Sequence, residues 1–478
     1  MLRCFYTWEE YDRGKGEYIR NQCSEEICEG SEKYCIFHEL SKEKDIGLFK
    51  QKLKKKLDTG DYNFRGYCFP IDADFSDAGF GKNVYFNGAT FQENVYFNGA
   101  TFQEKVEFNG ATFQGTFFGG ATFQDASFNR ATFKNASFDE VTFQNTTFTG
   151  ATFQDVSFEK TAFQEDADFK GAIFQNVSFY GAIFQNVSFN ETKFRKNVYF
   201  RRAIFQKNVS FNKTKFKNAS FDETTFQKNV SFNKAIIGRN LEFNPKEKQI
   251  KELNLQNTQF LLKGSVTADL TKAKFHRVAL ENVAFIDCKW PKKIHEETNM
   301  EDENLSFKEL ETIYRNLKQN MQRHGDYSKA GDFHYREMEC RKKAMREKRS
   351  SLNWFKSFGY SILKYTCGYG EKPERVIGVS LLIVLVVALF FMYNGIAMGE
   401  NTSEERVINY DLPLSLPSSQ AIKDFEQCLY CSFVTFTTLG YGDIHPIGFS
   451  KVVACVESFS GAFFIALFVV VFVRKMMR

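Results

Sequence analysis

Residues 121–160 read ATFQDASFNR ATFKNASFDE VTFQNTTFTG ATFQDVSFEK, and this stretch decides the fold of the N-terminal half. Phenylalanine stands at every fifth position in a strict run from Phe113 to Phe163. Two positions before nearly every phenylalanine stands a small or β-branched residue. An α-helix repeats its faces about every 3.6 residues and a strand about every 2, so a step of five fits neither. It fits a chain that turns one corner in each repeat.

Four such sides would close a square coil of about 20 residues, and neighbouring coils would stack about 4.8 Å apart, as parallel strands do. Phenylalanine and the small residue would point inward, while Asn, Gln, Asp, Lys, Ser and Thr would cover the outside. Occasional steps of six, as from Phe91 to Phe97, are expected to add one residue at a corner, as a bulge does. We count 33 central positions from Phe75 to Phe243, which predicts about eight coils in that stretch.

This pattern resembles the pentapeptide-repeat family, whose motif is a small residue, one spacer and then Leu or Phe. The match runs from Ala73 to Phe243 almost without a break. It resumes more loosely at residues 253–255, 258–260, 268–270, 273–275 and 283–285. The resemblance implies a right-handed quadrilateral β-helix, which we assign to residues 64–290 as a β-solenoid domain.

The charge of the chain limits its partners. A net charge of +5 in 478 residues is too small to indicate nucleic-acid binding, and we expect none. Within the solenoid, residues 71–190 carry 14 acidic and 6 basic side chains, whereas residues 191–243 carry 4 acidic and 12 basic ones. The basic end either attracts anionic lipid head groups or is a solvated surface with contacts inside an oligomer.

Residues 1–60 are polar and are predicted to form a small Cys/His capping module. The segment Cys35-Ile-Phe-His38 has the CxxH spacing that places two metal ligands on one side of a tight turn. Three thiolates and one imidazole suit a tetrahedral structural Zn²⁺ site, and the preferred set is Cys4, Cys23, Cys35 and His38, with Cys28 as the alternate. The alternative is a group of buried thiols without metal. A similar cluster often precedes pentapeptide repeats, so the resemblance implies a cap on the solenoid.

Residues 303–349 are predicted to form a cytoplasmic helical hairpin. Ser306 and Glu309 make a capping box, and His324-Gly325-Asp326 is the expected turn. One face of the first helix is apolar, formed by Phe307, Leu310, Ile313, Tyr314, Leu317 and Met321. The second helix ends in the basic residues Arg346, Lys348 and Arg349. The hairpin is either a coupling element between solenoid and membrane or an inert spacer.

Two apolar segments in residues 352–478 predict a membrane domain. Residues 376–393 contain no charge, extend to 23 residues at Met398, and can cross about 30 Å of hydrocarbon. Residues 452–473 form the second span and contain one acid, Glu457. Amphipathic residues 352–365 precede the first span and predict a helix lying along the inner leaflet. Basic clusters lie outside both spans, so both termini are expected in the cytoplasm, and Met1–Glu10 does not have the apolar stretch of a signal peptide.

Between the spans stands the sequence Thr438-Leu439-Gly440-Tyr441-Gly442-Asp443. Glycine at 440 and 442 permits backbone angles that are barred to other residues, so successive carbonyl oxygens can point toward one axis. Rings of such oxygens from four chains replace the water shell of K⁺. A short helix over residues 424–437 would direct the negative end of its dipole at the ion path, and Tyr441 would face away and brace the filter.

This hexapeptide closely resembles the T-x-G-Y-G-D signature of the potassium-channel family, and the resemblance covers residues 352–478. It implies a two-span, all-α pore and a homotetramer in the cell (inner) membrane, with K⁺ as the transported ion. Gly461 falls at the position of a gating hinge, although it also suits close helix packing. Glu457 is either a functional intramembrane acid or a hydrogen-bonded structural acid behind the filter. Tyr430 and Cys431 stand where some relatives carry two Trp, which predicts a looser brace.

A second match to the signature, Thr366-Cys367-Gly368-Tyr369-Gly370, precedes the first span and is predicted to be a connector. No voltage sensor, nucleotide-binding fingerprint or catalytic constellation is apparent, so we expect no enzyme. The sequence therefore predicts a multidomain potassium-channel subunit whose solenoid regulates gating by binding an unidentified ligand or protein. The alternative is a membrane-anchored pentapeptide-repeat scaffold without selective conductance.

Overall fold

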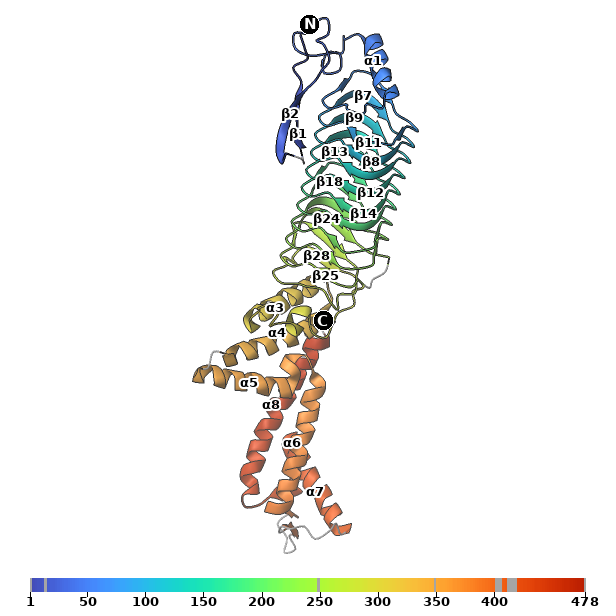
Figure 1. Ribbon diagram of the computed structural model, residues 1–478. Coiled ribbons are helices and arrows are strands. Elements are labelled where there is room, and N and C mark those ends of the chain that lie inside the picture. Colours follow the sequence, from blue (N-terminus) through green and yellow to red (C-terminus); the bar gives the residue numbers. More distant parts are fainter. Residues whose placement is uncertain are drawn as a thin grey trace. The chain divides into compact units, whose positions relative to one another are not determined.

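The computed structural model describes residues 2–12, 15–246, 250–347, 350–399, 406–410 and 419–476. The chain forms two compact units, Met1–Glu303 and Asn304–Arg478. The first contains the N-terminal module and the solenoid, and the second contains the remaining helices (Figure 1).

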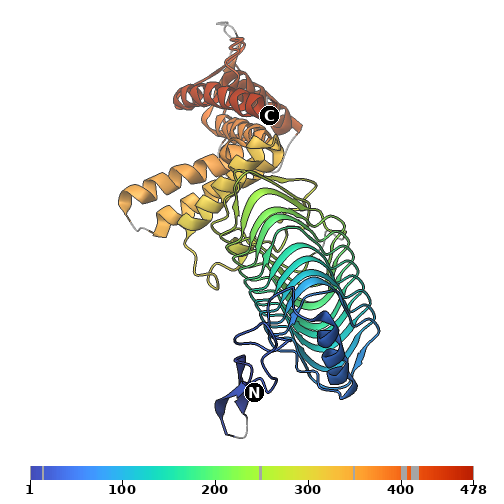
Figure 2. The same cartoon turned by 90° about the horizontal axis from the view of Figure 1, so that it is seen from above.

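The solenoid consists of two parallel sheets, between which successive segments of the chain alternate (Figure 2). The 12-stranded sheet contains β5 (Gly79–Phe80), β6 (Val84–Tyr85), β8 (Thr101–Glu107), β10 (Thr122–Ser127), β12 (Thr142–Thr147), β14 (Ala162–Asp168), β17 (Ile183–Ser188), β19 (Ile204–Phe205), β20 (Val209–Ser210), β22 (Thr225–Phe226), β23 (Val230–Ser231) and β25 (Leu253–Asn254). The 14-stranded sheet contains β3 (Cys68–Phe69), β4 (Ala73–Asp74), β7 (Thr90–Tyr96), β9 (Thr112–Phe117), β11 (Thr132–Ser137), β13 (Thr152–Ser157), β15 (Ile173–Phe174), β16 (Val177–Ser178), β18 (Lys193–Tyr199), β21 (Lys215–Ser220), β24 (Ile236–Phe243), β26 (Gln259–Phe260), β27 (Lys263–Val266) and β28 (Val283–Phe285).

The phenylalanines fill the centre of the solenoid, as the five-residue step predicted. Phe123 pairs in register with Phe143 on the next coil, and the rings of Phe108 and Phe128 stack with centroids 4.9 Å apart and planes at 1°. Phe128 and its small partner Ala126 are both fully buried. Each ring is therefore covered above and below by the next coils, and this stacking buries a continuous apolar column.

Steps of six produce bulges, also as predicted. Phe123 of β10 lies beside Phe102 of β8, but Asp125 lies beside Lys105, so β8 carries one extra residue between the paired positions. The extra residue is absorbed locally because the following inward pair, Ala126 and Val106, returns to register. The core column thus continues unbroken past a change of repeat length.

The looser repeats extend the solenoid beyond Phe243 to about 10 turns over residues 68–285. β24 pairs with β27, and β27 pairs with β28. The buried carboxylate of Glu296, in the short helix α2 (His295–Thr298), accepts hydrogen bonds from the backbone N–H groups of Phe275 and His276. A coil end without a further strand above it leaves such donors unpaired, so Glu296 closes this end of the stack.

The N-terminal module covers the first coil. It contains the antiparallel strands β1 (Thr7–Asp12) and β2 (Glu17–Gln22) and helix α1 (Ile46–Asp58), whose N-cap Asp45 accepts from the Leu48 N–H at 3.0 Å. The ring of Phe37 stacks on Tyr67 with centroids 4.3 Å apart. The Phe37 carbonyl accepts from the Cys68 N–H at 2.7 Å. The module therefore continues both the aromatic column and the backbone hydrogen bonds of the solenoid.

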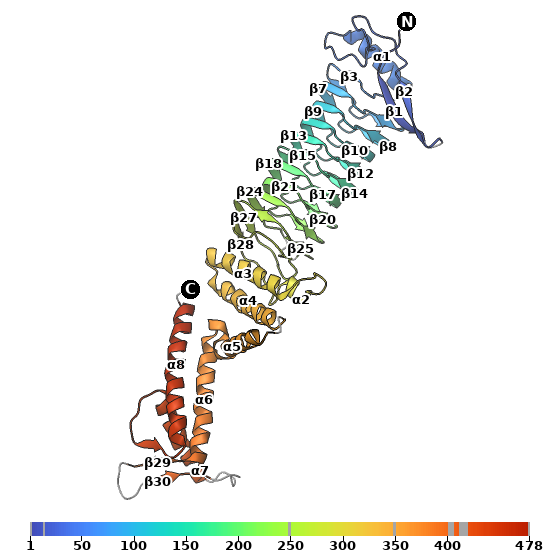
Figure 3. The same ribbon diagram turned by 90° about the vertical axis from the view of Figure 1, so that its left-hand side faces the viewer.

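The second unit begins with a helical hairpin, α3 (Phe307–Arg323) and α4 (Tyr327–Glu347). Its capping box of Ser306 and Glu309 is present as predicted. Helix α5 (Ser351–Cys367) follows, then the 3₁₀ turn Gly368–Gly370, α6 (Pro373–Asn394), α7 (Ser419–Phe436) and α8 (Ser450–Met476) (Figure 3). Of the predicted basic end of the hairpin, Lys348 and Arg349 lie outside the described residues.

The membrane domain differs from the sequence prediction in several details. The first span ends at Asn394 because Gly395 (φ 102°) turns the chain into a strand. A small sheet of β29 (Ile396–Met398), β30 (Arg406–Ile408) and β31 (Ile444–Pro446) follows, with β29 in its centre, although the domain was predicted to be all-α. Helix α7 begins at Ser419, five residues before the predicted start at 424.

A buried carboxylate holds the hairpin together. Glu337 of α4 is 2% exposed, and it accepts from Lys318 Nζ at 2.6 Å and from Arg315 Nε at 3.1 Å, both on α3. Arg341 and His334 of α4 lie on the same carboxylate at 3.3 and 3.6 Å. Burial by itself would raise the pKa of Glu337, but these donors outweigh it and lower that pKa to about 2.

Glu337→Gln is therefore expected to destabilise the hairpin by about 2 kcal/mol, because it removes the buried anion that accepts hydrogen bonds from partly exposed cations. Since the folded pKa is depressed, this stabilisation is complete above about pH 4.5 and is lost as the pH falls through about 2. Hydrogen exchange of α3 and α4 peptides, measured by mass spectrometry at each pH, should show less protection in the variant than in the wild type. That difference should shrink from pH 4.5 downward.

Asp332→Asn is the matched control, since Asp332 lies on the same helix in an exposed pair with Lys329. It should leave exchange unchanged. Equal protection in Glu337→Gln and wild type at neutral pH would contradict a stabilising role for this cluster.

Candidate ion-conducting pore and Cys/His cluster

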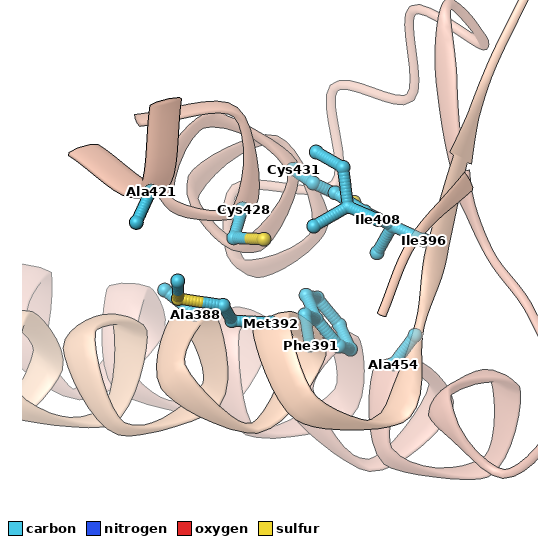
Figure 4. Close-up of a cluster of buried hydrophobic side chains, with 9 residues drawn as sticks. All are labelled: Ala388, Phe391, Met392, Ile396, Ile408, Ala421, Cys428, Cys431 and Ala454. Atoms are coloured by element: carbon cyan, nitrogen blue, oxygen red, sulfur yellow. The ribbon is translucent and has the colours of Figure 1, made fainter. Parts of the chain in front are cut away.

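Helix α7 is packed against α6 by a buried apolar cluster (Figure 4). Cys428 and Cys431, the CxxC pair of the sequence, face this cluster and are 0% and 4% exposed. They meet Ala388 and Met392 of α6 and Ile396 of β29. The pair thus serves as small apolar packing inside a helix, which is how free cysteine behaves in a core.

Helix α7 is also tied to both flanking helices through one serine. The buried Ser432 hydroxyl lies 2.8 Å from the Val384 carbonyl oxygen of α6 and 2.5 Å from Glu457 Oε1 of α8. Glu457 is 2% exposed, and its Oε2 has no hydrogen-bond partner among the described residues. The structure therefore places the intramembrane acid against α7 and hydrogen-bonded to Ser432. Sequence reasoning missed Ser432, because nothing in its own segment distinguishes it from other serines.

The N-terminal part of α7 is anchored by Asp424, which is 5% exposed. Its carboxylate accepts from Arg406 Nη2 of β30 at 2.5 Å, from the Tyr410 hydroxyl at 2.7 Å and from Gln420 Nε2 at 2.9 Å. Charge-assisted bonds of this kind fix orientation strongly. Both ends of α7 are consequently fixed, one by Asp424 and the other by Ser432 and its partners.

The hexapeptide 438–443 follows α7 after one residue, Thr437. The Thr438 N–H donates to the Thr435 carbonyl at 3.1 Å, and the Leu439 N–H donates to that of Val434 at 3.0 Å. Positive φ then recurs at every second residue, at Thr438 (57°), Gly440 (59°) and Gly442 (83°). The sequence indicated this freedom for the two glycines. It did not indicate that Thr438 would also have a positive φ, a conformation in which a side chain carries a steric cost.

Two large side chains of the hexapeptide are mostly exposed in the single chain. Leu439 is 57% exposed and Tyr441 is 68% exposed, so the bracing expected of Tyr441 has no counterpart within one subunit. The Thr438 hydroxyl donates to the Thr437 carbonyl at 2.7 Å. The Tyr430 side chain of α7 lies near Asp443, the last residue of the hexapeptide.

Gly461 of α8 lies against the C-terminal end of α7. A Cβ atom at this position would stand 1.8 Å from the Phe436 carbonyl oxygen and 2.7 Å from its carbon. Helix α8 is continuous from Ser450 to Met476. In this conformation Gly461 thus allows α8 to pack closely against Phe436 of α7. This is the packing role that the sequence left open as the alternative to a hinge.

Gly461→Ala is expected to displace the end of α7 and to reduce ion flux from proteoliposomes by at least about tenfold, since a clash of this size costs more than about 1.4 kcal/mol. Gly378→Ala in α6 is the control, because a Cβ there meets nothing within 4 Å. Normal flux through Gly461→Ala would show that α7 and α8 do not need this contact.

The predicted ligands of the N-terminal module come together. The ligand atoms of Cys4, Cys23, Cys35 and His38 all lie within 4.8 Å of one another, and all four residues are buried. His38 Nδ1 is 3.1 Å from Cys35 Sγ and 3.4 Å from Cys4 Sγ, and the Cys23 and Cys35 sulfurs are 3.9 Å apart. Cys28 lies apart from this group and donates to the Tyr34 carbonyl at 3.3 Å, so the structure favours the first set over the alternate.

Neighbouring groups orient this cluster. His38 Nε2 lies 2.9 Å from the Arg65 carbonyl oxygen of the first coil, which leaves Nδ1 facing the sulfurs. The Tyr6 ring stacks on His38 at 4.0 Å. The hydrogen bond with Cys23, and then burial, raise the pKa of the Cys35 thiol to about 12. A bound cation would favour the thiolate form of Cys35 near neutral pH.

Comparisons with known proteins agree with the two parts of the chain. Residues 407–478 match the family described as ion channel. Residues 121–198 match the pentapeptide repeat region, and residues 69–112 and 189–236 match pentapeptide repeats. A search of curated proteins found no match to this sequence.

Two solved structures resemble the solenoid. One is HetL, a pentapeptide repeat protein involved in heterocyst differentiation regulation from Nostoc sp. strain PCC 7120, with 11% identity, 50% of this chain and 97% of that chain covered, and a TM-score of 0.26. The other is full-length QnrB1, a plasmid-mediated fluoroquinolone resistance protein, with 14% identity, 50% and 98% coverage, and a TM-score of 0.20. Because these scores are low, the fold assignment depends on the strand register described above.

This chain joins a β-solenoid to a membrane domain. Two of its helices, α6 and α8, are long and apolar enough to cross a membrane. It carries pentapeptide repeats and an ion-channel domain in one sequence.

Proposed function

We propose that this protein is the subunit of a potassium-selective channel, a homotetramer in the cell (inner) membrane with both termini in the cytoplasm. The supporting observation is the hexapeptide Thr438–Asp443, in which positive φ alternates along the backbone at Thr438, Gly440 and Gly442. Such alternation allows successive carbonyl oxygens to face one axis. Four copies would surround K⁺ with the carbonyl oxygens of residues 438–441 and the Thr438 hydroxyl, in place of water.

A tetramer would cover apolar surface that is exposed in the single chain. Beside the hexapeptide, a hollow of about 740 Å³ is lined by Thr438, Ala454, Cys455 and Phe459, among others. Phe459 and Phe463 of α8 are 79% and 58% exposed. A neighbouring subunit would cover these apolar side chains and Tyr441, and a ring of identical subunits closes with such head-to-tail contacts.

We also propose that Cys4, Cys23, Cys35 and His38 hold a structural Zn²⁺. Three thiolates and one imidazole are a usual ligand set for a closed tetrahedral site, and their spacing allows one small ion. The His38–Arg65 contact supplies the hydrogen bond that a metal-bound histidine normally makes through its other ring nitrogen. The ion would stabilise the module that caps the solenoid.

Gating by the solenoid is the last part of the proposal, with an unidentified ligand or protein as its effector. Its support is a series of contacts that connect the hairpin to the membrane helices. Glu339 of α4 accepts from Lys364 of α5 at 2.7 Å and from the Tyr369 hydroxyl at 2.5 Å. Arg346 donates to Ser357 of α5 at 2.9 Å. A displaced hairpin would therefore move α5 and the connector to α6.

The first test is the reversal potential of the purified protein in a planar bilayer under a K⁺/Na⁺ gradient. A reversal near the K⁺ equilibrium value is expected. A conductance without preference for K⁺ would overturn the proposed selectivity. If a chain without residues 1–303 conducts with unchanged open probability, the solenoid is not the gate. If neither chain conducts, the protein is a membrane-anchored scaffold instead.

A further inference from the structure

The positive charge of the solenoid is concentrated on one face of the 14-stranded sheet. The strands β18, β21, β24 and β27 of that sheet are neighbours and follow one another along the solenoid (Figure 3). Together they carry seven basic residues and one acid. The basic residues, all exposed, are Lys193, Arg195, Lys196, Lys215, Lys217, Arg239 and Lys263. We call this surface the basic face.

The cations of the basic face form no ion pairs within the part of the chain that the structure describes. On an adjoining turn, by contrast, Lys213 lies 3.0 Å from Glu191 of the preceding coil. Ion pairs between successive coils are therefore possible in this solenoid, but the strands of the basic face do not form them. The acid of these strands, Glu242, accepts a hydrogen bond from the Ser220 hydroxyl at 3.0 Å.

Like charges are stacked in register on the basic face. Lys193 of β18 pairs with Lys215 of β21. The same column holds threonine or isoleucine in preceding coils, at Thr132, Thr152 and Ile173. Like charges directly opposite each other on strands about 4.8 Å apart destabilise a sheet. An anion lying across these strands would remove the repulsion, so the arrangement favours an anionic ligand.

Two exposed leucines continue the basic face. Leu261 and Leu262 are 52% and 65% exposed, and they lie between β26 and β27, beside residues 238–239 of β24. The Leu261 N–H donates to the Ile237 carbonyl at 2.9 Å, which holds this segment on the sheet. A purely ionic ligand such as a nucleic acid would match the cations but not the leucines. A ligand with both acidic and apolar side chains matches both.

A polypeptide segment fits this surface better than a flat bilayer does. Other strands of the same sheet carry exposed acids, such as Asp74 of β4 and Asp155 of β13. An anionic bilayer laid along the sheet would bring its charges against these acids, whereas anionic lipids attract basic surface. A segment that crosses β18, β21 and β24 would meet the cations and the leucines without reaching those acids.

We propose that the basic face binds a polypeptide segment of a partner protein that carries acidic and large apolar side chains. The acidic side chains would lie over β18 and β21, and the apolar ones would lie over Leu261 and Leu262. This segment would be the effector of the proposed gating, and that consequence alone rests on the proposed function. The binding itself needs no conducting pore.

The test is the binding of a fluorescein-labelled peptide of repeated Glu-Glu-Leu units, measured by fluorescence anisotropy. The full-length protein is held in phosphatidylcholine nanodiscs. We expect saturable binding that weakens as the salt concentration rises, because exposed charges are screened. A peptide of Glu-Glu-Ser units should bind at least about tenfold more weakly, since it has no apolar side chains to cover the leucines.

Substitutions on the basic face should weaken the binding of the Glu-Glu-Leu peptide. Lys217→Gln should weaken it by about threefold. The triple variant Lys193→Gln/Lys215→Gln/Lys217→Gln should weaken it by at least about tenfold, which corresponds to about 1.4 kcal/mol. Lys134→Gln is the matched control, because Lys134 is exposed on the same sheet outside the basic face and follows an inward phenylalanine as Lys217 does. It pairs in register with Gln154, so the sheet accommodates glutamine in this column.

The proposal is overturned if the triple variant binds as the wild type does, if both peptides bind equally, or if Lys134→Gln weakens binding as much as Lys217→Gln. Tighter binding of a single-stranded oligonucleotide than of the peptide would also overturn it, in favour of a nucleic-acid surface. Loss of peptide binding in nanodiscs that contain phosphatidylglycerol would assign the basic face to the bilayer instead. The assay needs no conductance, so a failure here is distinct from a failure of the channel proposal.

Discussion

Gly440→Ala is expected to abolish potassium-selective conductance. Gly440 has φ of 59°, and a side chain in this region costs about 1–2 kcal/mol per residue. In a tetramer that cost applies to every subunit, and it is relieved when the carbonyls turn away from the axis. We expect a reversal potential near zero under a K⁺/Na⁺ gradient, or no conductance at all.

Gly448→Ala is the control for this substitution. Gly448 has φ of 53°, lies after the hexapeptide, and a Cβ there meets nothing within 4 Å, as is also true of Gly440. Both variants therefore carry the same backbone cost in open space, and only one lies in the filter. A wild-type reversal potential in Gly440→Ala would mean that these carbonyls do not select the ion.

Removal of the proposed Zn²⁺ ion is expected to unfold the N-terminal module. Structural zinc contributes about 10–16 kcal/mol of apparent binding free energy in small domains. Apart from Ile36, Phe37 and Phe49, few apolar side chains of this module are buried, so the ion would contribute much of its stability. Cys35→Ser should abolish zinc binding, and Cys28→Ser should not, because Cys28 lies outside the cluster.

Metal analysis of the purified protein should give one zinc per chain, and a chelator should remove it together with the hydrogen-exchange protection of β1, β2 and α1. Protection of the central coils should remain, since repeat proteins lose their ends without losing the whole array. A protein that contains no zinc, or whose Cys35→Ser variant keeps full protection of this module, would contradict the structural role.

The solenoid follows from the sequence alone, because one five-residue unit repeats along the chain and each copy imposes the same inward pair. The same reasoning predicted the bulges from steps of six and the capping box at Ser306. It also indicated the hexapeptide, since of the two matches to the signature only this one lies between the two apolar segments. Each of these features is local, so a short window of residues carries all the necessary information.

The tertiary structure alone decided the contacts between distant residues. Gly461 and Phe436 are separated along the chain, and only the packing of α8 on α7 shows that a Cβ would not fit between them. Ser432 became important because α6 and α8 each bring an oxygen to its hydroxyl. The tertiary structure also showed that Cys28 lies apart from the Cys/His cluster. It likewise showed that Tyr369 and Gly370 of the connector line a cavity. The physical reason is that a contact free energy depends on distances in space, which periodicity and spacing along one segment do not specify.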